Sequence, residues 1–329
     1  WGRTWPAVQL DHEKFIANVR GAKRGKSGGV AGLVNEHNRL LMEEPGGTGP
    51  LEEVSLLIAR GKVPPKARAA LSIGKLTALD KRGVDVRGIV AGHAVRRLVG
   101  RTLAQQFVGE CVEVTKPHQY ALGVGAGIDA AVFDLRIHLE NSPDSVVVSV
   151  DGVGAYDNVR RVAMFQALID NESLHPLIPH VRMFYSAEST YLFEEDSGVS
   201  QITQKQGGEQ GDALMPLLYC IALAPVLRQV EVELNARGIR HKLYAYLDDI
   251  YIWVEDRDKA REAHDLLRER MREGIGVDVN EGKTKLWGKR PERPEGWEDR
   301  RDAWCPEGIV IGDGDGLRVL GAPIGSDEY

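Results

Sequence analysis

The sequence predicts an α+β fold in which acidic residues lie at one edge of a sheet. In residues 242–254, KLYAYLDDIYIWV, two runs of β-forming residues flank Asp248 and Asp249, which indicates a hairpin with an acidic turn. Residues 146–150 form a nearly unbroken β-branched run that ends at Asp151, the pattern of a buried strand. If the hairpin and this strand share one sheet, Asp151 and Asp248 can converge at its edge, where the adjacent Asp249 also lies.

The other elements follow from periodicity and from Gly and Pro breaks. Helices are expected at 11–19, 32–42, 51–60, 93–110, 128–139, 158–170, 212–235 and 258–273. Further strands are expected at 69–79, 84–90, 189–193, 199–204 and 277–279. Pro216 fits the first turn of its helix, where proline is tolerated, and Gly274 ends the last one.

Composition bounds the class of protein. The chain has 329 residues and 43% hydrophobic content, which suffices for two or three packed lobes. No uninterrupted apolar run approaches the ~18 residues of a membrane span, so no membrane partner is expected. The three widely spaced cysteines argue against a disulfide framework or a zinc finger and favour a reducing compartment. Because Trp1 replaces an initiator Met, a longer parent protein is expected.

Charge is unevenly distributed along the chain. The net charge is −6, yet residues 57–110 carry eleven Lys or Arg against three acids, a local excess of +8. This basic region could bind phosphates. By contrast, two adjacent aspartates repel each other by roughly 4 kcal/mol at ~4 Å and an effective dielectric of ~20. The acidic turn is therefore either simply solvated or neutralised by a divalent cation.

Three sequence motifs carry a resemblance to a known family. They are DGVGAYD at 151–157, GGEQGDALMP at 207–216 and YLDD at 246–249. With KLTALDKRGVDVRGIVAGHAVRRLVGR at 75–101 and GVDVNEGKTKLW at 276–287, they resemble in order and spacing the polymerase core of a reverse transcriptase. The non-LTR (LINE-like) retrotransposon type is the most similar. The resemblance implies a right-hand polymerase fold with fingers and an antiparallel palm sheet backed by helices, and a thumb that is largely missing.

The resemblance also assigns the catalytic residues. It implies that Asp151, Asp248 and Asp249 are catalytic metal ligands for two Mg²⁺ ions, with Mn²⁺ as a substitute. Tyr156 would lie under the incoming sugar and favour dNTPs. Lys283 would act as a general acid near the leaving pyrophosphate, with Lys285 as the second choice.

Further residues are assigned to substrate binding by the same resemblance. Gln210 and Gly211 would approach the nucleotide and template base closely. Arg87 and Lys81 would hold the triphosphate, with Lys75 and Arg82 as rivals of Lys81. Gln119 and Tyr120 resemble a segment that lines the template path, and residues 319–324 resemble a primer-grip turn.

The resemblance divides the chain into four segments. Residues 1–50 would be an N-terminal helical extension, 51–145 the fingers and 146–290 the palm. Residues 291–329 would form a charged loop and the primer-grip-like turn that leads to the absent thumb.

The implied function is that of an RNA-directed DNA polymerase from a retrotransposon. Its partners would be an RNA template, a DNA primer and dNTPs, with further domains in a longer polyprotein. The family implies an intracellular, nuclear location. Three alternatives stay open: an inactive polymerase relic, a non-catalytic RNA-binding module, and a group II intron maturase-type reverse transcriptase.

Overall fold

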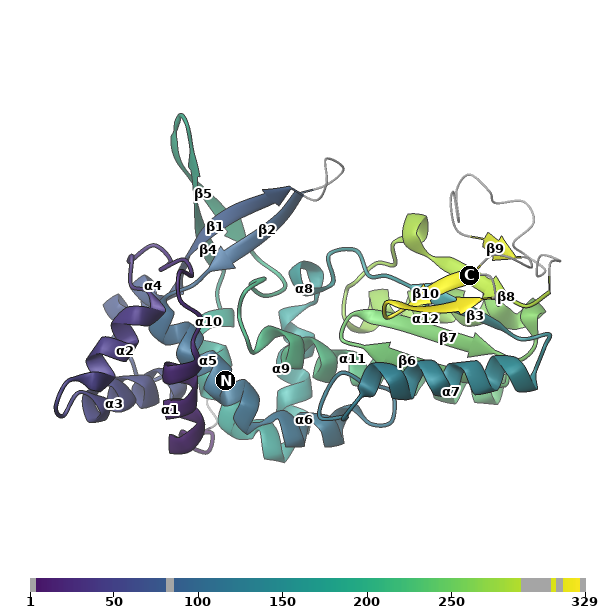
Figure 1. Ribbon diagram of the computed structural model, residues 1–329, viewed down its shortest axis with the longest axis horizontal. Coiled ribbons are helices and arrows are strands. Elements are labelled where there is room, and N and C mark those ends of the chain that lie inside the picture. The colour runs from purple at the N-terminus through teal and green to yellow at the C-terminus, as the bar shows by residue number, and fades with distance from the viewer. Residues whose placement is uncertain (1–3, 81–85, 291–308, 312–315, 326–329) are drawn as a thin grey trace. The chain divides into compact units, whose positions relative to one another are not determined.

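The computed structural model describes residues 4–80, 86–290, 309–311 and 316–325 (Figure 1). The chain forms two compact units, and each unit combines two separate stretches of sequence. Unit 1 consists of Trp1–Glu110 and Met164–Leu218, and unit 2 of Cys111–Ala163 and Tyr219–Tyr329. The four-segment division made from the sequence stays a prediction.

Unit 1 opens with helices that surround α5 (Ala94–Gln106). They are α1 (His12–Gly21), α2 (Asn35–Glu43) and α3 (Thr48–Ala59). All three contact α5, and α2 also contacts α1 and α3. Asp11 caps α1, because its carboxylate accepts a hydrogen bond from the backbone N–H of Lys14 at 2.9 Å. Phe15 and Val19 on α1 and Leu98 on α5 are buried.

A four-stranded sheet follows in unit 1, in the order β2-β1-β4-β5. Its strands are β1 (Ile73–Asp80), β2 (Val86–Ala91), β4 (Ser189–Glu195) and β5 (Gly198–Gln204). The β1–β2 and β4–β5 pairs are antiparallel hairpins, as the sequence predicted, whereas β1 and β4 pair in parallel. That parallel pairing joins segments more than one hundred residues apart, which no local pattern indicates.

Two predicted elements of the basic region differ in the structure. Residues 65–72, partly assigned to a strand, form α4 (Pro65–Ser72), because Pro65 fits a first helical turn and β-branched residues begin only at Ile73. The single helix expected at 93–110 is two helices, α5 and α6 (Val108–Thr115), which meet at the buried Phe107.

Unit 2 is built on a five-stranded sheet in the order β6-β7-β3-β8-β9. Its strands are β3 (Val146–Val150), β6 (His241–Tyr246), β7 (Asp249–Val254), β8 (Lys285–Gly288) and β9 (Ile309–Ile311). The pairs are antiparallel except β8–β9. Of these strands, β3, β6 and β7 were predicted; the strand predicted at 277–279 is only an isolated bridge between Val279 and Gly152.

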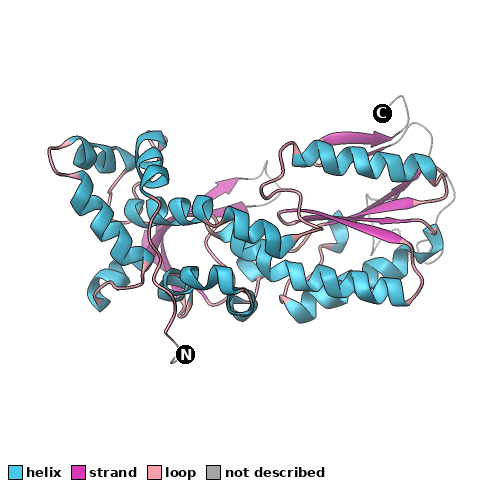
Figure 2. Cartoon of the chain, turned by 90° about the horizontal axis from the view of Figure 1, so that it is seen from below, coloured by secondary structure: helices cyan, strands magenta, loops and turns pink. Residues whose placement is uncertain are grey.

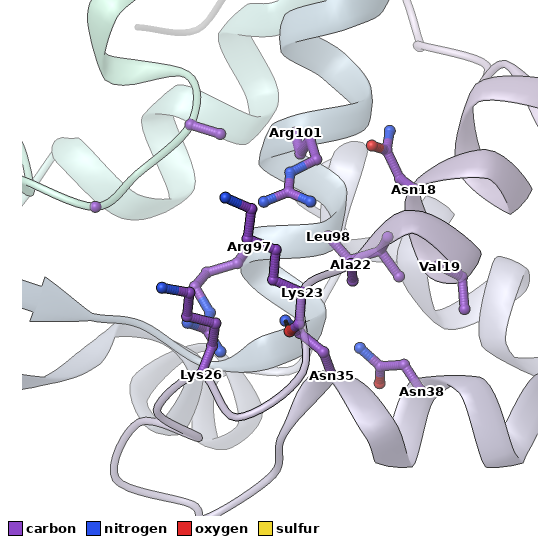
Figure 3. Close-up of a pocket in the computed structure, with 12 residues that line it drawn as sticks. Asn18, Val19, Ala22, Lys23, Lys26, Asn35, Asn38, Arg97, Leu98 and Arg101 are labelled. Atoms are coloured by element: carbon purple, nitrogen blue, oxygen red, sulfur yellow. Dashed lines mark hydrogen bonds between the residues drawn. The ribbon is translucent and has the colours of Figure 1, made fainter.

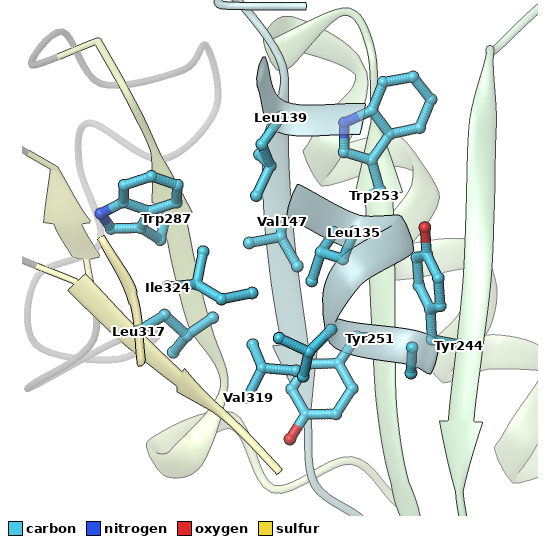
Figure 4. Close-up of a cluster of buried hydrophobic side chains, with 12 residues drawn as sticks. Leu135, Leu139, Val147, Tyr244, Tyr251, Trp253, Trp287, Leu317, Val319 and Ile324 are labelled. Atoms are coloured by element: carbon cyan, nitrogen blue, oxygen red, sulfur yellow. The ribbon is translucent and has the colours of Figure 1, made fainter. Parts of the chain in front are cut away.

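Helices lie on both faces of this sheet (Figure 2). Leu135 and Leu139 of α7 (Gly127–Asn141) pack with Val147 of the central strand (Figure 4). The amphipathic helix α12 (Ala260–Gly274) contacts β3 and β7. Burial on both faces explains why the β3 sequence is almost continuously apolar.

A separate two-stranded hairpin completes the core of unit 2. It consists of β10 (Gly316–Val319) and β11 (Ala322–Gly325), joined at Leu320 and Gly321, which both have positive φ. Leu317, Val319 and Ile324 are buried in the cluster that contains Trp287 (Figure 4). The primer-grip-like segment of the sequence is therefore a hairpin that packs against the main sheet.

The remaining helices lie between strands β3 and β4 and between β5 and β6 in the sequence. They are α8 (Ala155–Asn158), α9 (Arg161–Asp170), α10 (Ile178–Tyr185) and α11 (Met215–Ala236), with short 3₁₀ turns at Glu172–Leu177, Arg257–Lys259 and Glu281–Lys283. By length and composition, α11 alone among the described helices could cross a membrane, but 67% of its apolar window is buried inside the protein. Such burial is typical of a core helix.

Candidate active site

Three carboxylates meet at one edge of the unit 2 sheet. Val150 pairs with Ile250 across the antiparallel β3–β7 ladder, so Asp151, the next residue, comes opposite Asp249. Tyr246 pairs with Asp249, which leaves Leu247 and Asp248 as the two residues of the β6–β7 turn. The structure thus brings Asp151, Asp248 and Asp249 together, as the sequence predicted.

The three carboxylates at this edge carry more negative charge than the single neighbouring cation, Lys283, compensates. The pKa of Asp249 is raised to about 6, first by loss of water around its carboxylate and then by the charges of Asp248 and Asp151. Like charges disfavour ionisation of a neighbouring carboxyl group, whereas a bound cation favours it. The edge is therefore suited to attract a cation.

Two neighbouring side chains bind these carboxylates. Lys283 Nζ lies 2.9 Å from Asp151 Oδ2, and Tyr156 donates its hydroxyl hydrogen to Asp248 Oδ1 at 3.2 Å. The lysine is fixed near the site because the N–H of Asn280 donates to the carbonyl oxygen of Asp151 at 2.7 Å. Lys283, predicted near a leaving group, thus contacts a predicted metal ligand.

Tyr219 is a component of this site that the sequence analysis missed. It is fully buried, and its ring meets that of Tyr156 edge-on, with centroids 5.3 Å apart. Burial, followed by the charges of Asp248, Asp151 and Asp249, raises the pKa of Tyr219. A tyrosine within the apolar run PLLYCIAL was the only available signal.

The donor set at this edge suits a divalent cation in its chemistry. Within the described ranges, no group of three His, Cys, Asp or Glu side chains is arranged as a metal site. The carboxylates of Asp151 and Asp248 are instead engaged by Lys283 and Tyr156. Carboxylate oxygens are nevertheless the donors that Mg²⁺ prefers, and their mutual repulsion would be relieved by it. The residues present fit the ion chemically.

Gln210 and Gly211 lie in unit 1, in a loop held against β2. The N–H of Val90 donates to the Gln210 carbonyl at 2.9 Å. Gly211 has φ of 137°, and a Cβ there would lie 2.3 Å from the Val90 carbonyl oxygen. Only glycine permits this approach.

A buried ion network holds the same loop. Arg96 Nη1 lies 2.9 Å from Glu209 Oε1, and Arg96 Nη2 lies 3.6 Å from Asp212 Oδ2. Tyr185 donates its hydroxyl hydrogen to Asp212 at 2.6 Å, and the Arg96 guanidinium stacks 3.9 Å from the Phe184 ring centre. Although burial opposes its charge, the carboxylates raise the pKa of Arg96. No local sequence pattern indicates this network.

The predicted triphosphate clamp is only partly described. Arg87 is exposed on β2, opposite Leu79 of β1. Lys81 and its rival Arg82 lie outside the described residues. Lys75, the other rival, is bound to Glu194 at 2.7 Å on the same sheet, which leaves it less suited to a triphosphate.

A basic cavity of about 170 Å³ lies among α1, α2, α5 and the Gly211 loop of unit 1 (Figure 3). Its cationic lining residues are Lys23, Lys26, Arg97 and Arg101. No acidic side chain lines it, and within the described part of the chain none of the four forms an ion pair. The sequence analysis counted Arg97 and Arg101 in the basic region but missed the lysines from the N-terminal extension.

Comparison with known proteins identifies the family. Residues 80–321 match the family described as "Reverse transcriptase (RNA-dependent DNA polymerase)", so this chain belongs to that family. A curated relative is the retrovirus-related Pol polyprotein from type-2 retrotransposable element R2DM of Drosophila melanogaster, 21% identical over 212 residues. The match covers 63% of this chain and 20% of that polyprotein, so the chain spans only a fifth of its relative.

Solved structures agree on the fold. Telomerase from Candida albicans, determined with a fragment of telomeric RNA, superposes with a TM-score of 0.52 and 14% identity, covering 68% of this chain and 44% of the telomerase. Apo telomerase from Candida tropicalis gives 0.51 and 14%, covering 69% and 46%. The chain therefore has a polymerase fold and contains a reverse transcriptase domain, which is similar to that of a retrotransposon polyprotein.

Proposed function

We propose that this domain is an active RNA-directed DNA polymerase that extends a primer 3′-hydroxyl with dNTPs. The convergence of Asp151, Asp248 and Asp249 at one sheet edge carries this proposal. Intact carboxylates at this edge argue against a decayed relic. The comparisons support the polymerase family, and the wider retrotransposon machinery, including further domains and nuclear work, is part of the proposal.

The carboxylates would hold two Mg²⁺ ions, with Mn²⁺ as a substitute. Such ions lower the pKa of an attacking hydroxyl and neutralise charge on a leaving pyrophosphate. Lys283 would leave Asp151 and donate a proton to the pyrophosphate oxygen. General acid catalysis of this kind contributes ~10²–10⁴ in rate.

Tyr156 would select the sugar. Its hydroxyl is bound to Asp248, and its ring rests against the buried Tyr219. These two contacts fix the ring beside the carboxylates, where it would exclude a ribose 2′-hydroxyl. We therefore expect strong preference for dNTPs over NTPs.

Unit 1 would bind the nucleic acid and the triphosphate. Gln210 and Gly211 would approach the nucleotide and template base, Arg87 would hold phosphate oxygens, and Lys81 remains the predicted partner of Arg87. The basic cavity beside Gly211 offers Lys23 and Arg101, among others, to a phosphate of the RNA template.

Primer extension with dNTPs and, in parallel, with NTPs tests this proposal. Wild-type protein is given an RNA template, a DNA primer and Mg²⁺, with either dNTPs or NTPs, beside the Tyr156→Ala variant. We expect extension with dNTPs alone in the wild type and added NTP incorporation in the variant. Metal-independent binding of primer–template without extension would favour the RNA-binding module instead.

A further inference from the structure

Leu247, which immediately precedes the catalytic aspartate pair, has an unusual backbone conformation. Its φ is 56°, in the left-handed region that a leucine rarely adopts. A two-residue hairpin turn favours positive φ, but Gly, Asn or Asp usually supplies it. For leucine this conformation is sterically unfavourable, so the surrounding structure must hold it in place.

The side chain of Gln119 supplies that hold. Its Oε1 accepts a hydrogen bond from the Leu247 N–H at 2.7 Å, and its Nε2 donates to the Leu247 carbonyl at 3.3 Å. The same Oε1 also accepts from the N–H of Ala121 at 3.3 Å. Gln119 is 7% exposed. One buried amide therefore satisfies both backbone groups of the strained residue.

The backbone around Gln119 is itself anchored to the sheet. The N–H of Ala245 donates to the His118 carbonyl, and the N–H of Tyr120 donates to the Ala245 carbonyl, both at 2.8 Å. Tyr120 also packs against Tyr244, with ring centroids 5.8 Å apart. The segment is thus fixed along β6, which prevents the amide from following a displaced turn.

We propose that Gln119 is a positioning residue for the catalytic carboxylates. It holds Leu247 in the left-handed conformation. The backbone direction set at Leu247 then orients the carboxylates of Asp248 and Asp249. This assignment replaces the template-path role expected for Gln119 from the sequence, because the amide is buried against the turn. The inference rests on the proposed function in that the carboxylates are taken as the metal ligands.

The test compares Gln119→Ala with wild type in two independent measurements. Loss of a residue that orients metal ligands typically costs about 10–100-fold in metal affinity or activity. We expect kcat for primer extension to fall by about that factor, with the Kd for primer–template unchanged. Mn²⁺ binding, followed by electron paramagnetic resonance without substrate, should weaken about tenfold. The matched control is Gln229→Ala, which removes an exposed glutamine bonded to Glu233 on α11 and should change neither quantity.

A second variant separates positioning from general support of the fold. Leu247→Gly adopts positive φ without strain, so the turn should depend less on the amide. In a double-mutant cycle, Gln119→Ala should therefore cost clearly less in the Leu247→Gly background than in wild type. Equal losses in both backgrounds would overturn the proposal, as would unchanged kcat and Mn²⁺ affinity in Gln119→Ala.

The two measurements also separate this inference from the proposed function. If wild-type protein binds Mn²⁺ but extends no primer, the polymerase proposal fails. A tenfold loss of Mn²⁺ affinity in Gln119→Ala would then still support the positioning role.

Discussion

The two units of this domain differ in how far their clustered charged groups are neutralised. In unit 1, the buried Arg96 is bound to Glu209 and Asp212 beside the Gln210–Gly211 loop. In unit 2, three carboxylates lie together at a sheet edge. Among the described ion pairs, only one involves any of these three, the pair of Asp151 with Lys283. The first arrangement neutralises charge where water is absent, and the second leaves a net negative charge, because one lysine faces three carboxylates.

This difference separates charges that build the site from charges that would act in it. A buried ion network is fixed by its own geometry and becomes costly when one partner is lost. A cluster of carboxylates with a net negative charge lowers stability unless a cation binds. Its presence in the folded protein therefore indicates a site for a positively charged ligand. Loss of a charge should therefore reduce activity more than stability in unit 2, and stability more than activity in unit 1.

Asp151→Asn should give the largest functional effect with the smallest structural one. Metal-assisted charge stabilisation is worth several kcal/mol, so primer extension should slow by about 10³-fold or more. The thermal midpoint should change little, because weaker repulsion with Asp248 and Asp249 offsets the loss of the ion pair with Lys283. Extension rates and calorimetry measure the two quantities. Asp278→Asn, at an exposed aspartate of unit 2, should leave both unchanged; a large drop in midpoint for Asp151→Asn would contradict the comparison.

Arg96→Met should do the reverse and destabilise the fold. Removing the arginine leaves Glu209 and Asp212 buried without a cation, which costs about 3–5 kcal/mol of unfolding free energy. Denaturant unfolding measures this loss. The double variant Arg96→Met with Glu209→Gln should recover part of it, and full stability in Arg96→Met alone would show that the network is not structural.

Acid should weaken unit 1 through the buried His180. Burial, opposed by Asp212 and reinforced by Arg96, lowers the pKa of His180 to about 4 from 6.5. The unfolded chain therefore takes up a proton below pH 6.5 that the folded protein refuses until about pH 4. From this residue, stability should fall by about 2–4 kcal/mol over that window. Unfolding of His180→Gln should lose this part of the pH dependence, whereas His37→Gln, at an exposed histidine, should retain it.

The smallest expected effect concerns the basic cavity. Lys23→Gln and Arg101→Gln should each weaken RNA binding to a similar degree for all sequences and lower the log–log salt slope by about 1. Fluorescence anisotropy at several salt concentrations measures both. Lys259→Gln, at an exposed lysine of unit 2 outside both the cavity and the basic region, serves as the control. An unchanged slope for both cavity variants would remove the cavity from the RNA path.

Sequence patterns predicted the acidic edge because its determinants are local. The β-branched run before Asp151 and the strands around Asp248 each reveal themselves within a few residues. Their meeting then follows from pairing in one sheet. The family resemblance predicted the polymerase fold. Gly211 has a positive φ and lies close to the Val90 carbonyl, whereas the approach of Gln210 and Gly211 to the nucleotide stays a prediction.

The remaining features depend on contacts between distant residues. The hold of Gln119 on Leu247 spans 128 positions, and the Arg96–Glu209 pair spans 113. Neither has a periodic pattern that would reveal it. The parallel pairing of β1 with β4 is hidden for the same reason, since each strand looks like an ordinary hairpin arm.

Single-nucleotide incorporation measured across a Mg²⁺ titration tests the central claim most directly. Wild-type protein and Asp248→Asn are mixed with one dNTP, an RNA template and a DNA primer, under conditions where both bind primer–template. The account predicts Mg²⁺-dependent, saturable incorporation by the wild type and none by the variant. Equal incorporation by the two proteins would show that the acidic edge of unit 2 is not the catalytic centre.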